Sequence, residues 1–181
     1  MPRFEGFSEK SRLYMENYDI ISEFEEEFKS DIKSLFNAIE DEIKRQDWFD
    51  GEEWKIWKSG FSIQVYKHNW KKGREGIHFA IYYGKWEMKS KEVTIGLYFE
   101  PTKNREQVVK RLFELSKEKH DELTRNNYKV HNRGATFVNK KFKFDEGTIV
   151  DDVVEELNDI IFLGEYIDAA LKSTEGALHE L

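Results

Sequence analysis

The residues whose types suit chemistry are few, and the histidines come first. His68 and His78 lie on either side of a basic loop, and they would face each other if the flanking segments form a hairpin. With Tyr98 or Glu100 nearby on the same face, they could bind a metal or relay protons. The chain has no His-Glu-x-x-His spacing and no carboxylate pair to complete a ligand set. Two polar residues on a half-exposed sheet explain the pattern better, so we predict no metal site.

A Glu-x-Lys motif at Glu87-Met88-Lys89 has the form with which PD-(D/E)XK nucleases hold Mg²⁺ and orient water. That chemistry also needs an aspartate on the preceding strand. Charged residues make up 36% of the chain, so such a motif arises readily by chance. The chain has no Walker A loop, no G-x-G-x-x-G fingerprint and no G-x-S-x-G elbow. We therefore assign no catalytic residue and no cofactor, and we lean towards a protein that is not an enzyme.

Basic and aromatic residues on strand-like segments give the strongest functional signal. Such residues on a sheet commonly hold single strands or phosphate backbones. Lysines also protect edge strands against aggregation, and a net charge of −7 opposes binding to nucleic acid. We favour this second interpretation. The candidates for nucleic-acid binding are Lys67, Trp70, Lys71, Lys72, Arg74, Lys141 and Lys143.

Three runs of alternating apolar residues between positions 60 and 101 predict an antiparallel meander. The alternation separates a face that helices should cover from an outer face. The covered face should hold Phe61, Ile63, Val65, Ile77, Phe79, Ile81, Val93, Ile95, Leu97 and Phe99. The outer face should present Tyr66, His78, Tyr82 and Tyr98, which we take as a candidate interaction face.

The tyrosines of this outer face could form one aromatic band across three strands. Left exposed, the band would be an unusually large apolar patch for a monomer. Residues 1–17, a tryptophan-bearing connector at residues 46–59, or a second copy of the chain could cover it. A second copy needs no extra element, so we predict a homodimer.

Helical periodicity surrounds the meander. Apolar residues at steps of three and four predict helices over residues 18–45, 104–126 and 149–172, and two short strands separate the last two helices. Gly164 lies in the last apolar stripe, where a missing side chain permits close approach of a neighbour.

The predicted fold class is α+β, with one antiparallel sheet of about five strands packed against three helices in the order α-β-β-β-α-β-β-α. Residues expected to be buried together are Phe28, Leu35, Ile63, Phe79, Ile95, Leu97, Leu112, Leu157 and Ile160.

Length and composition limit the class of protein. The 181 residues suffice for one domain, which we place at residues 18–172, between an arm at 1–17 and a frayed tail at 173–181. Cysteine is absent, which excludes disulfides, thiolate zinc sites and a cysteine nucleophile, and this fits the cytoplasm. No apolar run approaches the ~18 residues that span a bilayer. We therefore expect a cytoplasmic protein without membrane contact.

The stretch Glu92-Val93-Thr94-Ile95-Gly96-Leu97-Tyr98-Phe99, the helix that follows and then Tyr128-Lys129-Val130 carry a resemblance. They resemble the uncharacterised domain that is often fused behind PD-(D/E)XK nuclease-like modules, over about residues 19–171. The resemblance implies an accessory role near nucleic-acid-processing systems, without catalysis.

Two functional classes follow from the sequence. We expect a non-catalytic intracellular interaction domain that binds a protein partner or itself. The alternative is a nucleic-acid-binding accessory domain of a nuclease or defence system, which would use the basic hairpin loop. Affinity that falls steeply with added salt would distinguish the second class from the first.

Overall fold

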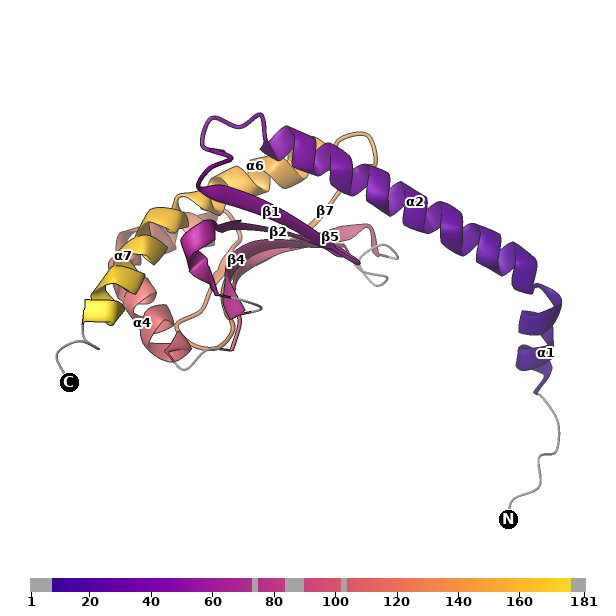
Figure 1. Cartoon of the computed structure of the whole chain (residues 1–181), viewed down its shortest axis with the longest axis horizontal. Coiled ribbons are helices and arrows are strands. Elements are labelled where there is room, and N and C mark those ends of the chain that lie inside the picture. Colours follow the sequence, from indigo (N-terminus) through magenta and orange to yellow (C-terminus); the bar gives the residue numbers. More distant parts are fainter. Residues whose placement is uncertain (1–7, 73–74, 84–89, 102–103, 177–181) are drawn as a thin grey trace, which may run out of the picture. The chain divides into compact units, whose positions relative to one another are not determined.

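A computed structural model describes residues 8–72, 75–83, 90–101 and 104–176 of the chain (Figure 1). The chain divides into two units, Met1–Asn37 and Ala38–Leu181. This division falls within the predicted helix over residues 18–45. Among the described residues, no helix has both the length and the apolar character that crossing a bilayer requires.

The first unit contains α1 (Glu9–Glu16) and most of α2 (Tyr18–Ile43). The Ser8 side chain caps α1 by accepting a hydrogen bond from the backbone N–H of Ser11 at 3.2 Å. Asn17 ends it, since its backbone N–H and its side-chain amide both donate to the carbonyl of Leu13, at 3.1 and 2.8 Å. Part of the predicted arm is thus a helix, which its short length and weak periodicity concealed.

The second unit contains one antiparallel sheet, which Figure 1 shows as strongly curved. Its strands are β1 (Trp54–Ser59), β2 (Ser62–Lys67), β3 (Lys71–Lys72), β4 (Glu75–Tyr82), β5 (Glu92–Phe99), β6 (Lys129–Val130) and β7 (Thr136–Lys143). The strand order is β1-β2-β4-β5-β7-β6, and β3 pairs with β4 off this path. The predicted α+β class with an antiparallel sheet is confirmed, with more strands than expected. The additional strands are β1, which lies in the predicted tryptophan-bearing connector at residues 46–59, and β3, which lies in the basic loop.

The predicted helices over residues 104–126 and 149–172 are each broken once, at Ser116 and at Phe162. In the described part of the second unit, the helices besides the end of α2 are α4 (Arg105–Leu115), α5 (His120–Arg125), α6 (Ile149–Ile161) and α7 (Leu163–Gly176), with 3₁₀ turns η1 (His68–Trp70) and η2 (Lys117–Lys119). The break after α4 lies at Ser116, whose backbone N–H and hydroxyl both donate to the carbonyl of Leu112, at 2.9 and 2.8 Å. A serine bonded in this way competes with helix continuation.

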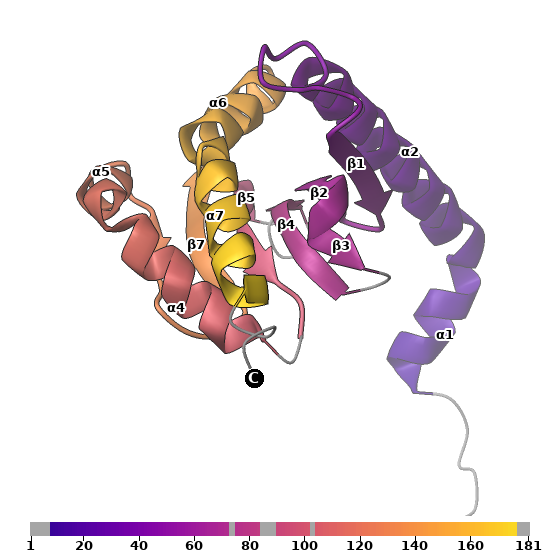
Figure 2. The ribbon, with the colours of Figure 1, turned by 60° about the vertical axis from the view of Figure 1, so that its left-hand side comes forward.

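The covered face of the sheet agrees with the alternation. All of its predicted residues from Ile63 to Phe99 are buried. A Cβ at Gly164 in α7 would lie 3.3 Å from the Trp54 ring and 3.4 Å from the Trp70 ring, so the missing side chain does permit the predicted close approach. Helix α4 lies beside α7 (Figure 2).

Three residues depart from the predicted core. Phe61 is 38% exposed, because it precedes β2 and follows Gly60, whose φ of +51° places it in a turn. Phe28 and Leu35 in α2 are half-exposed. Periodicity predicts that an apolar stripe exists, but it does not show how much of that stripe is covered.

Candidate interaction surface

Two of the predicted nucleic-acid residues lie in the interior. Lys67 is 8% exposed and Trp70 is 5% exposed. The Lys67 ammonium donates to Asp168 in α7 at 2.8 Å and to Glu53 at 2.9 Å, while the Trp70 indole N–H donates to Asp168 at 2.6 Å. Burial lowers the pKa of Lys67, but the hydrogen bonds to Asp168 and Glu53 outweigh it and raise that pKa above its ordinary value. Lys67 and Trp70 therefore connect the sheet to α7, and little of either side chain is accessible to nucleic acid.

Of the remaining basic candidates, only Lys141 and Lys143 have described side chains. Lys141 and Lys143 are exposed on β7, and Lys141 forms an ion pair with Glu92 at 2.7 Å. Lys71 and Lys72 form β3, of which only the backbone is described. The predicted candidate Arg74 and the Glu87-Met88-Lys89 motif lie outside the described residues.

The four residues of the predicted interaction face do lie on one face of the sheet. The register places His78 opposite Tyr98 and Gln64 opposite Ala80. Tyr66 lies two residues after Gln64 on β2, and Tyr82 lies two residues after Ala80 on β4, so both side chains belong to the same face. The rings of His78 and Tyr98 stack with centroids 6.2 Å apart, and those of Tyr82 and Tyr98 meet edge-on at 5.3 Å. Three of the four side chains are thus in direct ring contact.

Small residues beneath the tyrosines allow this contact. Ala80 pairs with Gly96, and a Cβ at Gly96 would lie only 2.4 Å from the Val138 carbonyl oxygen. Tyr82 follows Ala80 by two residues, and Tyr98 follows Gly96 by two residues on an antiparallel strand. Their rings therefore approach from opposite ends of this small pair and meet above it. The outer face is filled by its own aromatic rings at this point.

The four residues Tyr66, His78, Tyr82 and Tyr98, which we call the aromatic cluster, are less exposed than the sequence suggested. His78 is 3% exposed, and Tyr66, Tyr82 and Tyr98 are half-buried. Burial raises the pKa of Tyr98 to about 12, and burial, assisted by the negative charge of Glu100, raises the pKa of Tyr82. Tyr82 and Tyr98 therefore remain neutral at physiological pH, and they offer a partner rings and hydroxyl groups without charge.

A serine and a histidine that the sequence did not single out also approach each other. Ser116 Oγ lies 3.1 Å from His120 Nε2, and burial lowers the pKa of His120. Ser116 has no exposed surface, and its hydroxyl proton is donated to the Leu112 carbonyl. A nucleophile must reach its substrate, so this pair is a structural contact. The described residues contain no group of three or more His, Asp or Glu placed to hold a metal ion.

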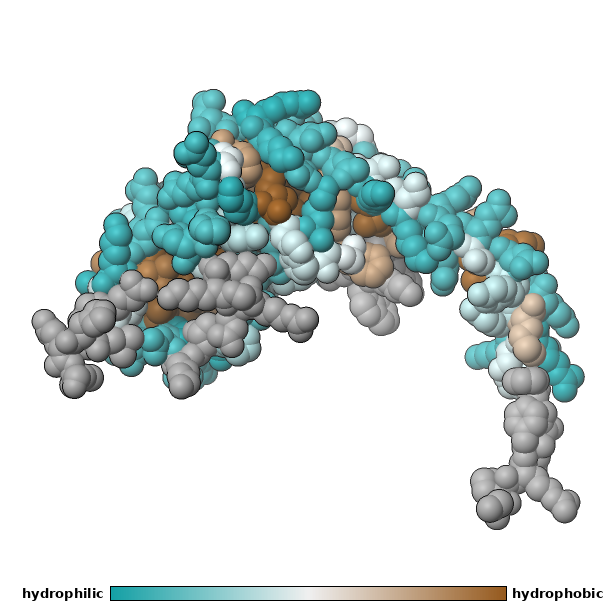
Figure 3. Space-filling view, in the orientation of Figure 1, coloured by the Kyte–Doolittle hydropathy of each residue, from teal (hydrophilic) through white to brown (hydrophobic). Residues whose placement is uncertain are grey.

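The open apolar surface lies in the first unit. Six of the eight large apolar side chains that are exposed in the described part of the chain belong to α1 and the first turns of α2. They are Leu13 (52%), Tyr14 (51%), Met15 (49%), Tyr18 (54%), Ile20 (54%) and Phe24 (64%). We call these six residues the N-terminal apolar surface. Figure 3 shows apolar side chains reaching the exterior where the two helices meet.

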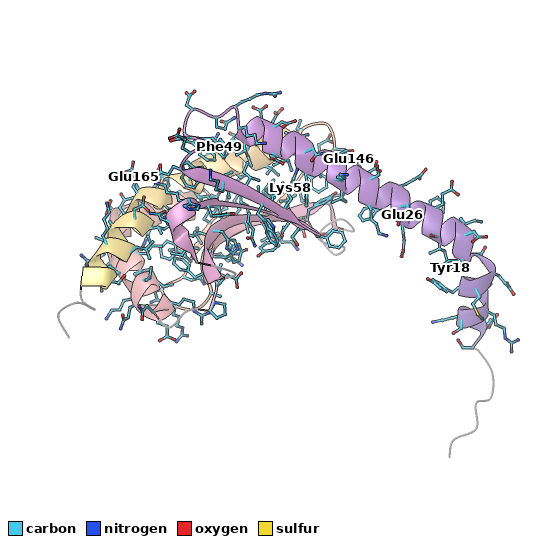
Figure 4. The ribbon with its side chains drawn as sticks, viewed as in Figure 1. Tyr18, Glu26, Phe49, Lys58, Glu146 and Glu165 are labelled. Carbon is cyan, nitrogen blue, oxygen red and sulfur yellow. The ribbon has the colours of Figure 1, made fainter. Side chains whose placement is uncertain are left out.

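Charge sets this surface apart from the aromatic cluster. Residues 13–28 contain six carboxylates and neither lysine nor arginine. The rings of Tyr14 and Tyr18 meet edge-on at 5.8 Å across Asn17, which joins the apolar side chains of the two helices. Figure 4 labels Tyr18 at the start of α2 and Glu26 farther along it. Sequence reasoning did not single out this surface, although carboxylates and aromatic residues are interleaved throughout residues 13–28.

Comparisons with known proteins do not add to this geometry. No family model, no curated protein and no solved structure matches the chain. The resemblance to the nuclease-fused domain therefore stays a hypothesis. Its strand, helix and short strand correspond to β5, α4 and β6, a sequence of elements that many α+β folds contain.

Proposed function

We propose that this chain is a non-catalytic interaction domain that binds a protein partner or a second copy through the N-terminal apolar surface. The supporting observation is the concentration of exposed large apolar side chains in α1 and the first half of α2, which contrasts with their rarity elsewhere in the described chain. Apolar patches of this kind on soluble proteins commonly mark binding surfaces.

The arrangement of the apolar side chains suits one mode of recognition. An amphipathic helix that enters a groove presents anchors at positions i, i+3 and i+7. In α2 these positions are filled by Ile21, Phe24 and Phe28, and Ile20 lies beside them. Phe24 is the most exposed of the large apolar residues, at 64%. Aromatic side chains, phenylalanine included, are enriched in protein interfaces. Phe24 is therefore the proposed central contact.

The aromatic cluster of the sheet gives weaker support to the same function. Tyr82 and Tyr98 are half-buried and contact each other, so they offer less apolar area to a partner. Nucleic-acid binding receives less support again, since Lys67 is buried and Lys141 pairs with Glu92. The homodimer remains a proposal, and the experiment below includes it.

The test compares the charge substitution Phe24→Glu with a matched control, Phe61→Glu. Both remove an exposed phenylalanine and add one negative charge, and glutamate is compatible with the interior of a helix. Sedimentation at micromolar concentration measures self-association, and affinity purification followed by reconstitution with purified proteins measures binding to partners. The proposal expects an association that Phe24→Glu removes and Phe61→Glu retains.

Two results would contradict the proposal. One is that wild-type protein and Phe24→Glu form the same complexes with the same affinities. The other is that neither measurement detects any association for the wild-type chain.

A further inference from the structure

We infer that the N-terminal apolar surface binds a partner protein whose apolar groove is bordered by lysine and arginine, and that a second copy of the same surface is not this partner. The inference rests on the proposed function and specifies the chemistry of its partner. It is derived from the positions of the carboxylates relative to the exposed apolar side chains.

The carboxylates border the apolar side chains of α2 on both sides. Successive helical residues are rotated by about 100°, so Ile20, Phe24 and Ile21 fall within an arc of about 100°. On the same basis Glu27 and Glu23 lie beside one edge of this arc, and Glu25 lies within about 40° of the other edge. A groove that receives the apolar side chains would therefore meet negative charge along both of its walls. Basic walls complement this arrangement.

The same charges oppose pairing of two copies through this surface. Residues 13–28 contain no base, so any side-by-side pairing of this segment places carboxylates against carboxylates. The nearest bases are Lys29, which already pairs with Glu26 at 2.7 Å, and Lys10 and Arg12 in α1. These three bases could neutralise only three of the six carboxylates. A basic partner removes the repulsion altogether and also gains a faster, electrostatically steered association.

The predicted partner chemistry can be tested with synthetic peptides and the full chain. The first probe is an 18-residue amphipathic peptide with leucine on one helical face and lysine on the other. The second keeps the leucines and replaces lysine by glutamate, and the third keeps the lysines and replaces leucine by glutamine. Fluorescence anisotropy should show binding of the first peptide at least about tenfold tighter than of either control, with affinity that falls as salt is added.

Variants of the chain separate apolar docking from plain attraction between opposite charges. Phe24→Glu adds a negative charge, so purely electrostatic binding of the lysine peptide would become tighter. Docking through Phe24 predicts the opposite, a loss of about tenfold or more. Phe61→Glu has the same net charge and should leave the affinity unchanged. Glu23→Gln with Glu27→Gln should weaken binding and reduce its dependence on salt.

The outcomes also distinguish this inference from the function on which it rests. Equal binding of the leucine–lysine and glutamine–lysine peptides, or an unchanged affinity of Phe24→Glu, would overturn the basic-groove partner. Self-association that Phe24→Glu removes would overturn it too, while leaving the interaction function intact. If Phe24→Glu instead lowers the melting temperature of the isolated chain by several degrees, the chain covers this surface itself, and both proposals fail.

Discussion

The two ends of α2 carry the same apolar pattern and differ in exposure. At the C-terminal end, within the second unit, Ile39 is 1% exposed and Ile43 is fully buried. At the N-terminal end, within the first unit, Phe24 is 64% exposed and Ile21 is half-exposed. The amino-acid types and their helical spacing do not account for this difference. What differs is the cover that the fold provides.

The apolar stripe of α2 is regular along most of the helix. Its positions repeat every eleven residues, so that Ile21, Phe24 and Phe28 correspond to Ile32, Leu35 and Ile39. An eleven-residue repeat advances about 3.67 residues per turn, close to the 3.6 of a straight helix, and keeps the stripe on one side of the helix. The apolar face continues into the exposed end, where the proposed function would have a partner cover it.

The largest expected difference between the two ends is in amide hydrogen exchange. Amides around Ile43 should exchange only when the second unit unfolds, whereas a helix end with exposed apolar side chains opens locally. We expect the amides of residues 20–24 to exchange at least about a thousandfold faster than those of residues 40–44. Exchange monitored by NMR in the isolated chain checks this. Equal protection of the amides of residues 20–24 and 40–44 would contradict the difference between the two ends of α2.

Shortening an apolar side chain should have unequal effects on stability at the two ends. Ile43→Ala removes packed methyl groups from a fully buried site and should lower the free energy of unfolding by about 3 kcal/mol. Phe24→Ala changes an exposed position and should lower it by less than about 0.5 kcal/mol. Urea unfolding of both variants measures the difference. A large loss for Phe24→Ala would mean that the exposed end is covered in solution.

Ion pairs give a smaller contrast with a defined pH dependence. Glu40, whose side chain is 20% exposed, accepts from Lys44 at 2.6 Å and from Lys58. Glu26 is 71% exposed and pairs with Lys29 at 2.7 Å. The hydrogen bonds from Lys44 and Lys58 lower the pKa of Glu40 below its ordinary value of 4.5. The associated stability is therefore complete above pH 4.5 and is lost as the pH falls through the lower pKa of the folded state.

Neutral variants test this contrast. Glu40→Gln should lower the free energy of unfolding at pH 7 by about 1 kcal/mol and should flatten its decline below pH 4.5. Glu26→Gln should change neither measurably, because an exposed pair contributes little. Urea unfolding between pH 3 and pH 7 distinguishes these outcomes, and identical profiles for Glu40→Gln and the wild-type chain would contradict the role assigned to Glu40.

Much of the fold could be predicted from the sequence. The alternation between Ile63 and Phe99 identified both the strands and their buried face, because a period of two fixes which side chains share a face. Gly164 was identified as a point of close approach before its tryptophan neighbours were known. The separation of the tyrosines and His78 from the buried face followed from the same alternation.

Other features could not be predicted because they depend on distant parts of the chain. Lys67 lies at a buried position of β2. Burial of its charge is acceptable only because Glu53 and Asp168, 14 and 101 residues away in sequence, lie close to it. The breaks at Ser116 and Phe162 and the strand at β1 likewise depend on which neighbours a segment meets. Hydrophobic periodicity carries no information about those neighbours.

By itself the sequence determined the α+β class, the faces of the central strands and the apolar stripe of α2, since each follows from local periodicity. Only the tertiary structure decided which parts of those apolar faces are covered. It buried Ile39 and Ile43, partly enclosed Tyr82 and Tyr98, and left Phe24 exposed. The physical reason is that hydrophobic burial requires a second surface, and a second surface comes from packing between elements that are distant in sequence.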